Sequence, residues 1–272
     1  MDILAAYVVP HPPLAVPAVG RGEEHGIEKT LDSYREVARR IAELRPDTII
    51  VSSPHAPAYS NCFCISGGPV GHGDMANFRA PRTRMDIDYD TELVDAIRTL
   101  ADENDIPMVT GTREDAVIDH ATFVPLYYVN EAYTGYRLVR LGLSGLPAAS
   151  HRKLGRLIGE AVRHLGRRCV YIASGDLSHR LTPDGPYGFA PEGPVFDEKI
   201  CSILRSGELE GLFEMDSGLV EAAAQCGLDS FRIMTGALDG LSYETEFLSY
   251  EGPFGVGYGV CCYTVSENEV AR

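Results

Sequence analysis

Residues 169–179 read CVYIASGDLSH, an apolar run that stops at a glycine and continues into an aspartate and a histidine. The run Cys169–Ser174 predicts a buried strand, as found in parallel sheets that are covered on both faces. Two other runs are built alike, because Ile3–Val9 ends at a proline-rich loop and Thr48–Ser52 ends at Ser53-Pro54-His55. These runs predict strands of one sheet that share a polar edge.

Helical patterns alternate with the apolar runs. Glu24–Leu44 and Thr91–Asn104 predict helices, and Ser150–Leu165 is amphipathic, with Ser150 as its expected N-cap. This alternation indicates an α/β fold, namely a single domain with a mainly parallel or mixed central sheet flanked by helices. We expect the domain to span residues 1–265 and to be followed by a polar tail at 266–272.

Further elements are expected from the same patterns. The predicted short strands are Asn61–Ile65, Met108–Val109 and Tyr136–Leu143, and the closing strands are Phe247–Ser249 and Gly257–Val265. The predicted helix-like segments are His120–Tyr128, Val195–Leu204, Glu208–Glu214, Leu219–Gln225 and Ser230–Leu238, with a break at Cys226-Gly227. Two segments rich in glycine and proline are expected to be long loops, and the first of them is placed to cover a site: Gly67–Arg84 and Pro183–Pro194.

Composition narrows the class of protein. A chain of 272 residues with 44% hydrophobic and 23% charged residues suits one large domain. Its net charge of −15 argues against nucleic acid or an anionic membrane as a partner, because phosphate groups require a basic surface. No apolar run approaches the roughly 20 residues of a membrane-spanning helix, and Met1–Pro10 lacks the basic start of a secretory signal.

The cysteines indicate a reducing, cytoplasmic location. Their number is seven, which is odd, so a disulfide framework is not expected. Four of them lie in strand-like contexts and are expected to be small buried side chains: Cys62, Cys64, Cys261 and Cys262.

Four of the eight histidines follow a pattern. His11, His55 and His179 each come just after a predicted strand, and His120 stands at the head of an apolar segment. Ligands of α/β sheets bind beyond the carboxyl ends of parallel strands, so we expect the three strand-end imidazoles to converge on one edge. The others are expected elsewhere, on the surfaces of helices or in the glycine-rich loop: His25, His151, His164 and His72.

Converging imidazoles favour a metal site. Neutral imidazole is the commonest metal ligand in proteins, and two histidines plus one carboxylate with open positions suit ferrous iron in oxygen chemistry. A further histidine can move a proton, because its pKa lies near working pH. Asp176 would either orient His179 or stabilise its own turn. Zinc at such a site would instead activate water for hydrolysis.

The motifs VPHPP (residues 9–13), SPHA (53–56), DHATFVPL (119–126) and SGDLSH (174–179) resemble the catalytic-subunit superfamily of the class III extradiol ring-cleavage dioxygenases. The resemblance extends from residue 1 to about residue 265. Asp184–Pro194 and Ser249–Tyr258 are similar to the dioxygenase-like domain of the AmmeMemoRadiSam system proteins, which are relatives of the Memo proteins.

This resemblance implies an iron-dependent oxidoreductase that performs extradiol cleavage of a small catechol-type ring. It implies that His11 and His55 bind the metal, that His179 is the acid/base and that His120 lies on the substrate side. Fe²⁺ is the metal that the family implies, with Zn²⁺ and copper as alternatives. The resemblance also implies partner proteins from the same gene system, and a homo-oligomer is a further expectation.

The third metal ligand departs from the ring-cleaving enzymes, which use a glutamate that has no clear counterpart in residues 221–229. The Memo relatives carry Cys-Gly here, so Cys226 is the carried-over ligand, with Glu221 and Asp229 as fallbacks. A cysteine at a helix N-terminus is also expected to have a lowered pKa. Because dioxygen oxidises thiolates, a second hypothesis is a Memo-like metal-binding redox or modification factor without ring cleavage.

Overall fold

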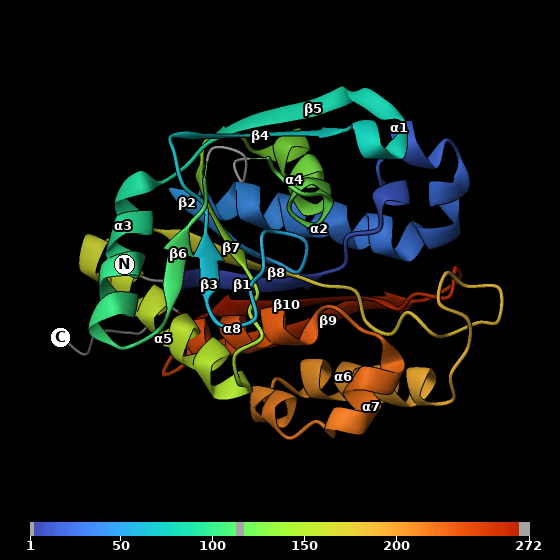
Figure 1. Cartoon of the computed structure of the whole chain (residues 1–272). Coiled ribbons are helices and arrows are strands. Elements are labelled where there is room, and N and C mark those ends of the chain that lie inside the picture. The colour runs from blue at the N-terminus through green and yellow to red at the C-terminus, as the bar shows by residue number, and fades with distance from the viewer. Residues whose placement is uncertain (1–2, 113–116, 267–272) are drawn as a thin grey trace.

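Eight strands form one sheet in the computed structural model of the chain, which describes residues 3–112 and 117–266 (Figure 1). Four neighbouring strands at its centre run parallel: β7 (Arg137–Gly142), β2 (Thr48–Ser53), β8 (Cys169–Ser174) and β1 (Ile3–Val9). The outer strands are β3 (Phe63–Ile65) and β6 (Met108–Thr110) beyond β7, and β10 (Tyr258–Val265) and β9 (Tyr243–Glu251) beyond β1. Antiparallel pairs occur at both sides, so the predicted α/β fold with a mixed central sheet is confirmed.

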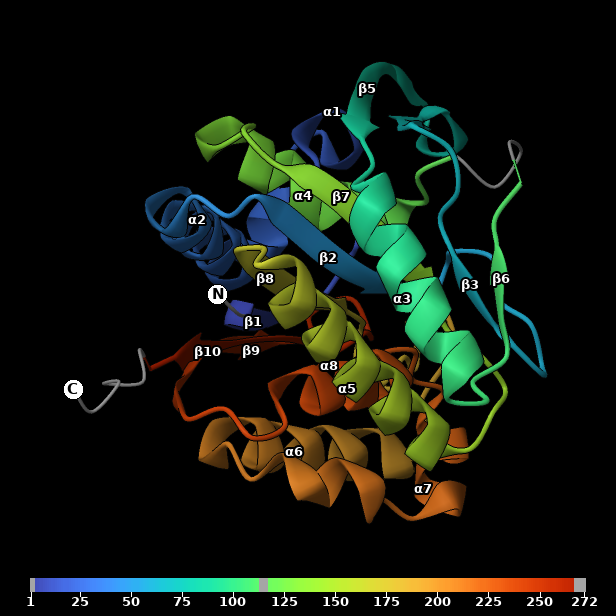
Figure 2. The same ribbon diagram turned by 90° about the vertical axis from the view of Figure 1, so that its left-hand side faces the viewer.

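Helices cover both faces of the sheet (Figure 2). One face carries α2 (Glu28–Leu44) and α4 (His120–Ala132). The other face carries α3 (Thr91–Glu103), α5 (Ala148–Leu165), α6 (Glu192–Ser206), α7 (Ser217–Ala223) and α8 (Leu228–Leu238). Successive residues of a strand point to opposite faces, so Ala6 and Val8 of β1 join one core while Tyr7 and Val9 join the other.

Short helical turns complete the described chain. They are η1 (Pro13–Ala15), α1 (Pro17–Gly20), η2 (Glu23–Ile27), η3 (Ala76–Phe78) and η5 (Leu209–Phe213). The predicted helix at Glu208–Glu214 is therefore a single 3-10 segment. The other predicted helices and strands differ from the structure mainly at their ends. Of the predicted tail at 266–272, residues 267–272 lie outside the described residues.

The prediction of a long loop at Gly67–Arg84 is wrong. This segment holds β4 (Val70–Met75) and the start of β5 (Ala80–Asp88), which pair antiparallel and are joined by η3 (Ala76–Phe78). The glycines that suggested a loop permit close packing instead. A Cβ atom on Gly73 would come within 2.7 Å of Ile118 Cβ, so a larger residue would displace the hairpin.

Two predictions about α5 are also wrong. The helix begins at Ala148, after Pro147, and so Ser150 lies inside the first turn instead of capping it. His151 is fully buried, because the face of α5 that carries it packs against neighbouring elements, and its ring stands edge-on to Phe63 at 4.9 Å. His25 and His164 are exposed, as expected.

All seven cysteines are free, so the expected absence of disulfides is confirmed for the whole set. Cys64, Cys261 and Cys262 are buried, whereas Cys62 is partly exposed, which differs from the prediction. Among the residues that the structure describes, no helix combines the length and the apolar character that crossing a bilayer requires.

Candidate metal centre

Three predicted site histidines lie at one edge of the sheet, because β1, β8 and β2 are adjacent parallel strands. His11 follows β1, His55 follows β2 and His179 follows β8. The rings of His11 and His55 are 5.1 Å apart and nearly perpendicular, at 87°. The structure therefore brings these imidazoles together from segments that are far apart in the chain.

Cys226 completes a group of metal-ligand atoms with His11 and His55. It lies in the short connection between α7 and α8, and its Sγ is 3.7 Å from His11 Nε2. The donor atoms of these three residues all lie within 4.8 Å of one another. Donors that share one ion at about 2.0–2.3 Å are separated by less than about 4.6 Å, so the group fits a single ion after small adjustments.

The fallback ligands lie elsewhere. Glu221 is exposed on α7. Asp229 pairs with Arg232 at 2.8 Å, and its other oxygen is 4.0 Å from His151 Nε2. Within residues 3–112 and 117–266, neither joins a group of potential metal ligands with His11 or His55.

Hydrogen bonds fix which nitrogen of His11 faces the site. Ser174 Oγ lies 2.6 Å from the carbonyl oxygen of Ala121 and donates its single proton there. The same hydroxyl can then only accept from His11 Nδ1, at 3.0 Å. His11 Nε2 therefore carries a lone pair directed toward Cys226, as a metal ligand requires. Burial, followed by the neighbouring histidines, lowers the pKa of His11 well below its usual value, so the ring is neutral.

His179 is oriented by the segment that precedes Cys226. Its Nδ1 donates to the carbonyl of Ala224, and its backbone N–H donates to the carbonyl of Ala223 at 3.1 Å. Because a carbonyl oxygen only accepts hydrogen bonds, Nδ1 carries the proton of the neutral ring and Nε2 carries a lone pair. Nε2 lies 4.0 Å from Asp176 Oδ2, so this imidazole is placed to accept a proton at the site.

Asp176 connects His11 to the segment that carries Cys226. Its Oδ1 accepts from the backbone N–H of His11 at 2.8 Å, and its own N–H donates to Cys226 Sγ at 3.2 Å. Its carbonyl accepts from the N–H of Gly227 at 3.1 Å. Burial raises the pKa of the Asp176 carboxyl group to about 7. Asp176 thus acts as a structural link between β8, His11 and the Cys226 segment, beyond its place in the turn.

Two glycines permit the Cys226 segment to approach β8. A Cβ atom on Gly175 would lie 2.1 Å from Gly227 Cα, which no packed structure accommodates.

The prediction of a low pKa for Cys226 is wrong, because burial and then the Asp176 carboxylate raise the pKa of the thiol well above its usual value. The desolvation of the sulfur outweighs any effect of the α8 N-terminus.

His120 stands beside the metal-ligand group as the first residue of α4. Its ring is 4.2 Å from that of His55 and 5.5 Å from that of His11. Burial, with a smaller effect of His55, lowers the pKa of His120 to about 4, so it is neutral near pH 7.

Ser53 and Asp119 belong to the sequence motifs described above, but the motifs do not predict that these residues support His55 and His120. Asp119 caps α4, accepts from Ser53 Oγ at 2.6 Å and pairs with Arg140 Nη1 at 3.3 Å. Ser53 Oγ in turn accepts from the backbone N–H of His55 at 3.2 Å. Arg140 lies on β7 with 2% of its surface exposed, and its only signal in the sequence is a charge inside an apolar strand.

Replacing Arg140 by methionine is expected to destabilise the protein by about 3–5 kcal/mol, because the largely enclosed Asp119 carboxylate keeps its hydrogen bonds from Ser53 and Thr122 but loses its ion-pair partner. Urea unfolding followed by circular dichroism measures the change. The matched control is Arg35→Met, which breaks an exposed pair with Asp32 and should cost about 1 kcal/mol or less. A loss for Arg140→Met no larger than that of the control would contradict the assigned role.

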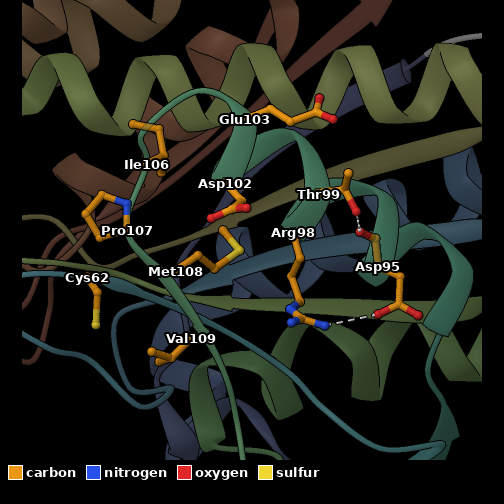
Figure 3. A pocket seen from close by; sticks show the side chains of 10 residues that line it. All are labelled: Cys62, Asp95, Arg98, Thr99, Asp102, Glu103, Ile106, Pro107, Met108 and Val109. Carbon is orange, nitrogen blue, oxygen red and sulfur yellow. Dashed lines mark hydrogen bonds and ion pairs between the residues drawn. The ribbon is translucent and has the colours of Figure 1, made fainter.

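A cavity lies beside α3 and β6, and Figure 3 shows the side chains that line it. Its volume is about 720 Å³. Asp95, Arg98 and Asp102 line it together with Cys62 and Met108, and Arg98 pairs with Asp95 at 3.3 Å. None of its lining residues belongs to the histidine cluster, so this cavity is separate from the metal centre.

Comparison with known proteins identifies one matching family and several relatives. The family defined by the catalytic LigB subunit of aromatic ring-opening dioxygenase matches residues 5–261. Protein CA_C1420 of Clostridium acetobutylicum is 38% identical over all of this chain, which spans 60% of the length of that relative. The 2-aminophenol 1,6-dioxygenase beta subunit of a Pseudomonas species is 23% identical, over 100% of this chain and 97% of its own.

Two further similarities are to a MEMO1 family protein and to a solved structure. MEMO1 family protein PAE0818 of Pyrobaculum aerophilum is 25% identical over 73% of this chain and 63% of its own. The crystal structure of the uncharacterized protein JW3007 from Escherichia coli K12 superposes with a TM-score of 0.59 at 16% identity, covering 95% of this chain and 99% of that one. The latter supports the fold alone.

Proposed function

Because the chain belongs to the family of the catalytic LigB subunit of aromatic ring-opening dioxygenases, we propose that it is a non-haem iron-dependent oxidoreductase acting on a small catechol-type ring. One observation carries the proposal: the donor atoms of His11, His55 and Cys226 lie within 4.8 Å of one another. His120 and His179 flank this group, which supports a role for both on the substrate side.

The ligand set suits a transition metal. Two neutral imidazoles and one thiolate favour first-row ions such as iron(II), and zinc and copper are the competing ions. When bound, the ion would supply open positions at which an aromatic diol and dioxygen meet. His11 would bind through Nε2, because its Nδ1 is engaged by Ser174.

The residues around the ion would handle protons. His179 Nε2 would accept the proton of a ring hydroxyl, while the carbonyl of Ala224 stabilises the resulting imidazolium through Nδ1. His120, which is neutral near pH 7, would donate or accept a hydrogen bond to the substrate oxygen without adding charge. Both atoms of dioxygen would enter the ring-opened product, so the reaction needs no external reductant.

The Cys226 thiol favours a second candidate function. A thiolate ligand is open to oxidation by dioxygen, and a MEMO1 family protein is among the relatives. In this alternative the chain is a Memo-like metal-binding redox or modification factor without ring cleavage. It would then act with partner proteins of its gene system or as a homo-oligomer.

Oxygen uptake by anaerobically iron-loaded protein distinguishes the two functions. The panel is catechol, 3,4-dihydroxyphenylacetate and 2-aminophenol, followed with an oxygen electrode and by product absorbance. We expect uptake that requires both iron and one substrate and that is absent in His11→Ala. Full iron binding without uptake for any of the compounds would contradict ring cleavage and favour the alternative.

A further inference from the structure

Two aromatic side chains from outside the central sheet flank the histidines. Phe78, in the turn between β4 and β5, lies 5.2 Å from the ring of His120, and the two planes are inclined at 65°. Tyr187, in the connection that leads to α6, lies 5.1 Å from the ring of His179 at 58°. Each of the two histidines that we place on the substrate side is thus accompanied by one aromatic ring.

Both aromatic residues lie on segments with their own anchors. The turn that carries Phe78 is tied to α1 because Arg21 Nη2 donates to the carbonyl of Arg79 at 3.2 Å. The segment around Tyr187 is closed by Ala190 N–H, which donates to the carbonyl of Arg180 at 3.2 Å. Figure 1 places these two segments at the same end of the molecule.

Their exposure points to a ligand. Tyr187 has 61% of its surface exposed although it contacts His179, and Phe78 is only half-buried. Apolar rings beside an otherwise polar cluster lose this exposed area when a flat molecule covers them. Aromatic pairs also prefer offset or edge-to-face contacts at centroid distances of about 4.5–7 Å, which these positions offer to a third ring.

We propose that Phe78 and Tyr187 are specificity-determining residues that form two walls of a subsite for one planar aromatic ring. The ring would contact Phe78 on the His120 side and Tyr187 on the His179 side, with its adjacent oxygens toward His11 and His55. This inference rests on the proposed function and adds the residues that select a ring over an aliphatic chelator.

Two chelating probes test the subsite on iron-loaded, oxygen-free protein: 4-nitrocatechol, which has a ring, and acetohydroxamate, which does not. We expect Tyr187→Ala and Phe78→Leu each to weaken 4-nitrocatechol binding about tenfold, or about 1.4 kcal/mol, with acetohydroxamate binding unchanged. Phe189→Ala, which removes an exposed ring from the same connection, is the matched control and should alter neither affinity.

The outcomes separate the two claims. If wild-type protein binds 4-nitrocatechol and both variants bind it as tightly, the subsite is wrong while the proposed function stands. If the binding of both probes is weakened equally, the variants disturb the metal centre and the ring-selecting role is again wrong. If wild-type protein holds iron but binds no 4-nitrocatechol, the proposed function itself fails.

Discussion

Cys226→Ala is expected to bind iron more than about 100-fold more weakly than wild type. Loss of a partner outside the coordination shell already costs about 10–100-fold in metal affinity, and loss of a ligand should cost more. The substitution also removes the acceptor of the Asp176 N–H, 3.2 Å away, and so loosens the contact between the two sides of the centre. Metal content after anaerobic loading and gel filtration measures the effect.

Cys62→Ala is the matched control for this experiment. Cys62 is also a free and partly exposed thiol, but it lines the cavity of Figure 3, away from the histidines. Its replacement should leave the metal content unchanged. Equal iron binding by Cys226→Ala and wild type would remove the thiolate from the ligand set.

His179→Gln is expected to retain iron and to lose about 10²–10⁴-fold in the turnover rate, the usual contribution of a positioned acid/base. Glutamine can still donate to the carbonyl of Ala224, but it offers no nitrogen that takes up a proton. The rate at saturating substrate and the metal content of the same sample are the two measurements.

His72→Gln serves as the control, because His72 is exposed on β4 and pairs with Asp86 at 2.7 Å. It should turn over like wild type. A His179→Gln rate within about threefold of wild type would contradict proton transfer by His179. Loss of iron together with activity would instead make His179 a metal ligand. The structure allows this, because the ligand atoms of Asp176, His179 and Cys226 also lie within 4.8 Å of one another.

The sheet and its polar edge follow from local sequence. The runs at Ile3–Val9 and Cys169–Ser174 are continuous and apolar because both faces are buried, and the structure reproduces their bounds without change. A histidine after each of three parallel strands implies a shared edge. Placing His11, His55 and His179 together therefore needs no knowledge of distant contacts.

Other features depend on contacts that local patterns do not encode. The sequence leaves the third ligand open among Cys226, Glu221 and Asp229, and only the fold places one of them beside His11. The Asp119–Arg140 pair joins the N-cap of α4 to β7, and this contact depends on the order of the strands in the sheet. The hairpin escapes prediction because its glycines, which serve close packing, are equally typical of a loop.

X-ray absorption at the iron edge of anaerobically loaded protein tests the central claim most directly, since it reports the atoms bound to the ion. Coordination by His11, His55 and Cys226 predicts one sulfur at about 2.3 Å together with imidazole nitrogens at about 2.0–2.1 Å, by analogy with zinc. A coordination shell of nitrogen and oxygen alone, with no sulfur, would contradict it.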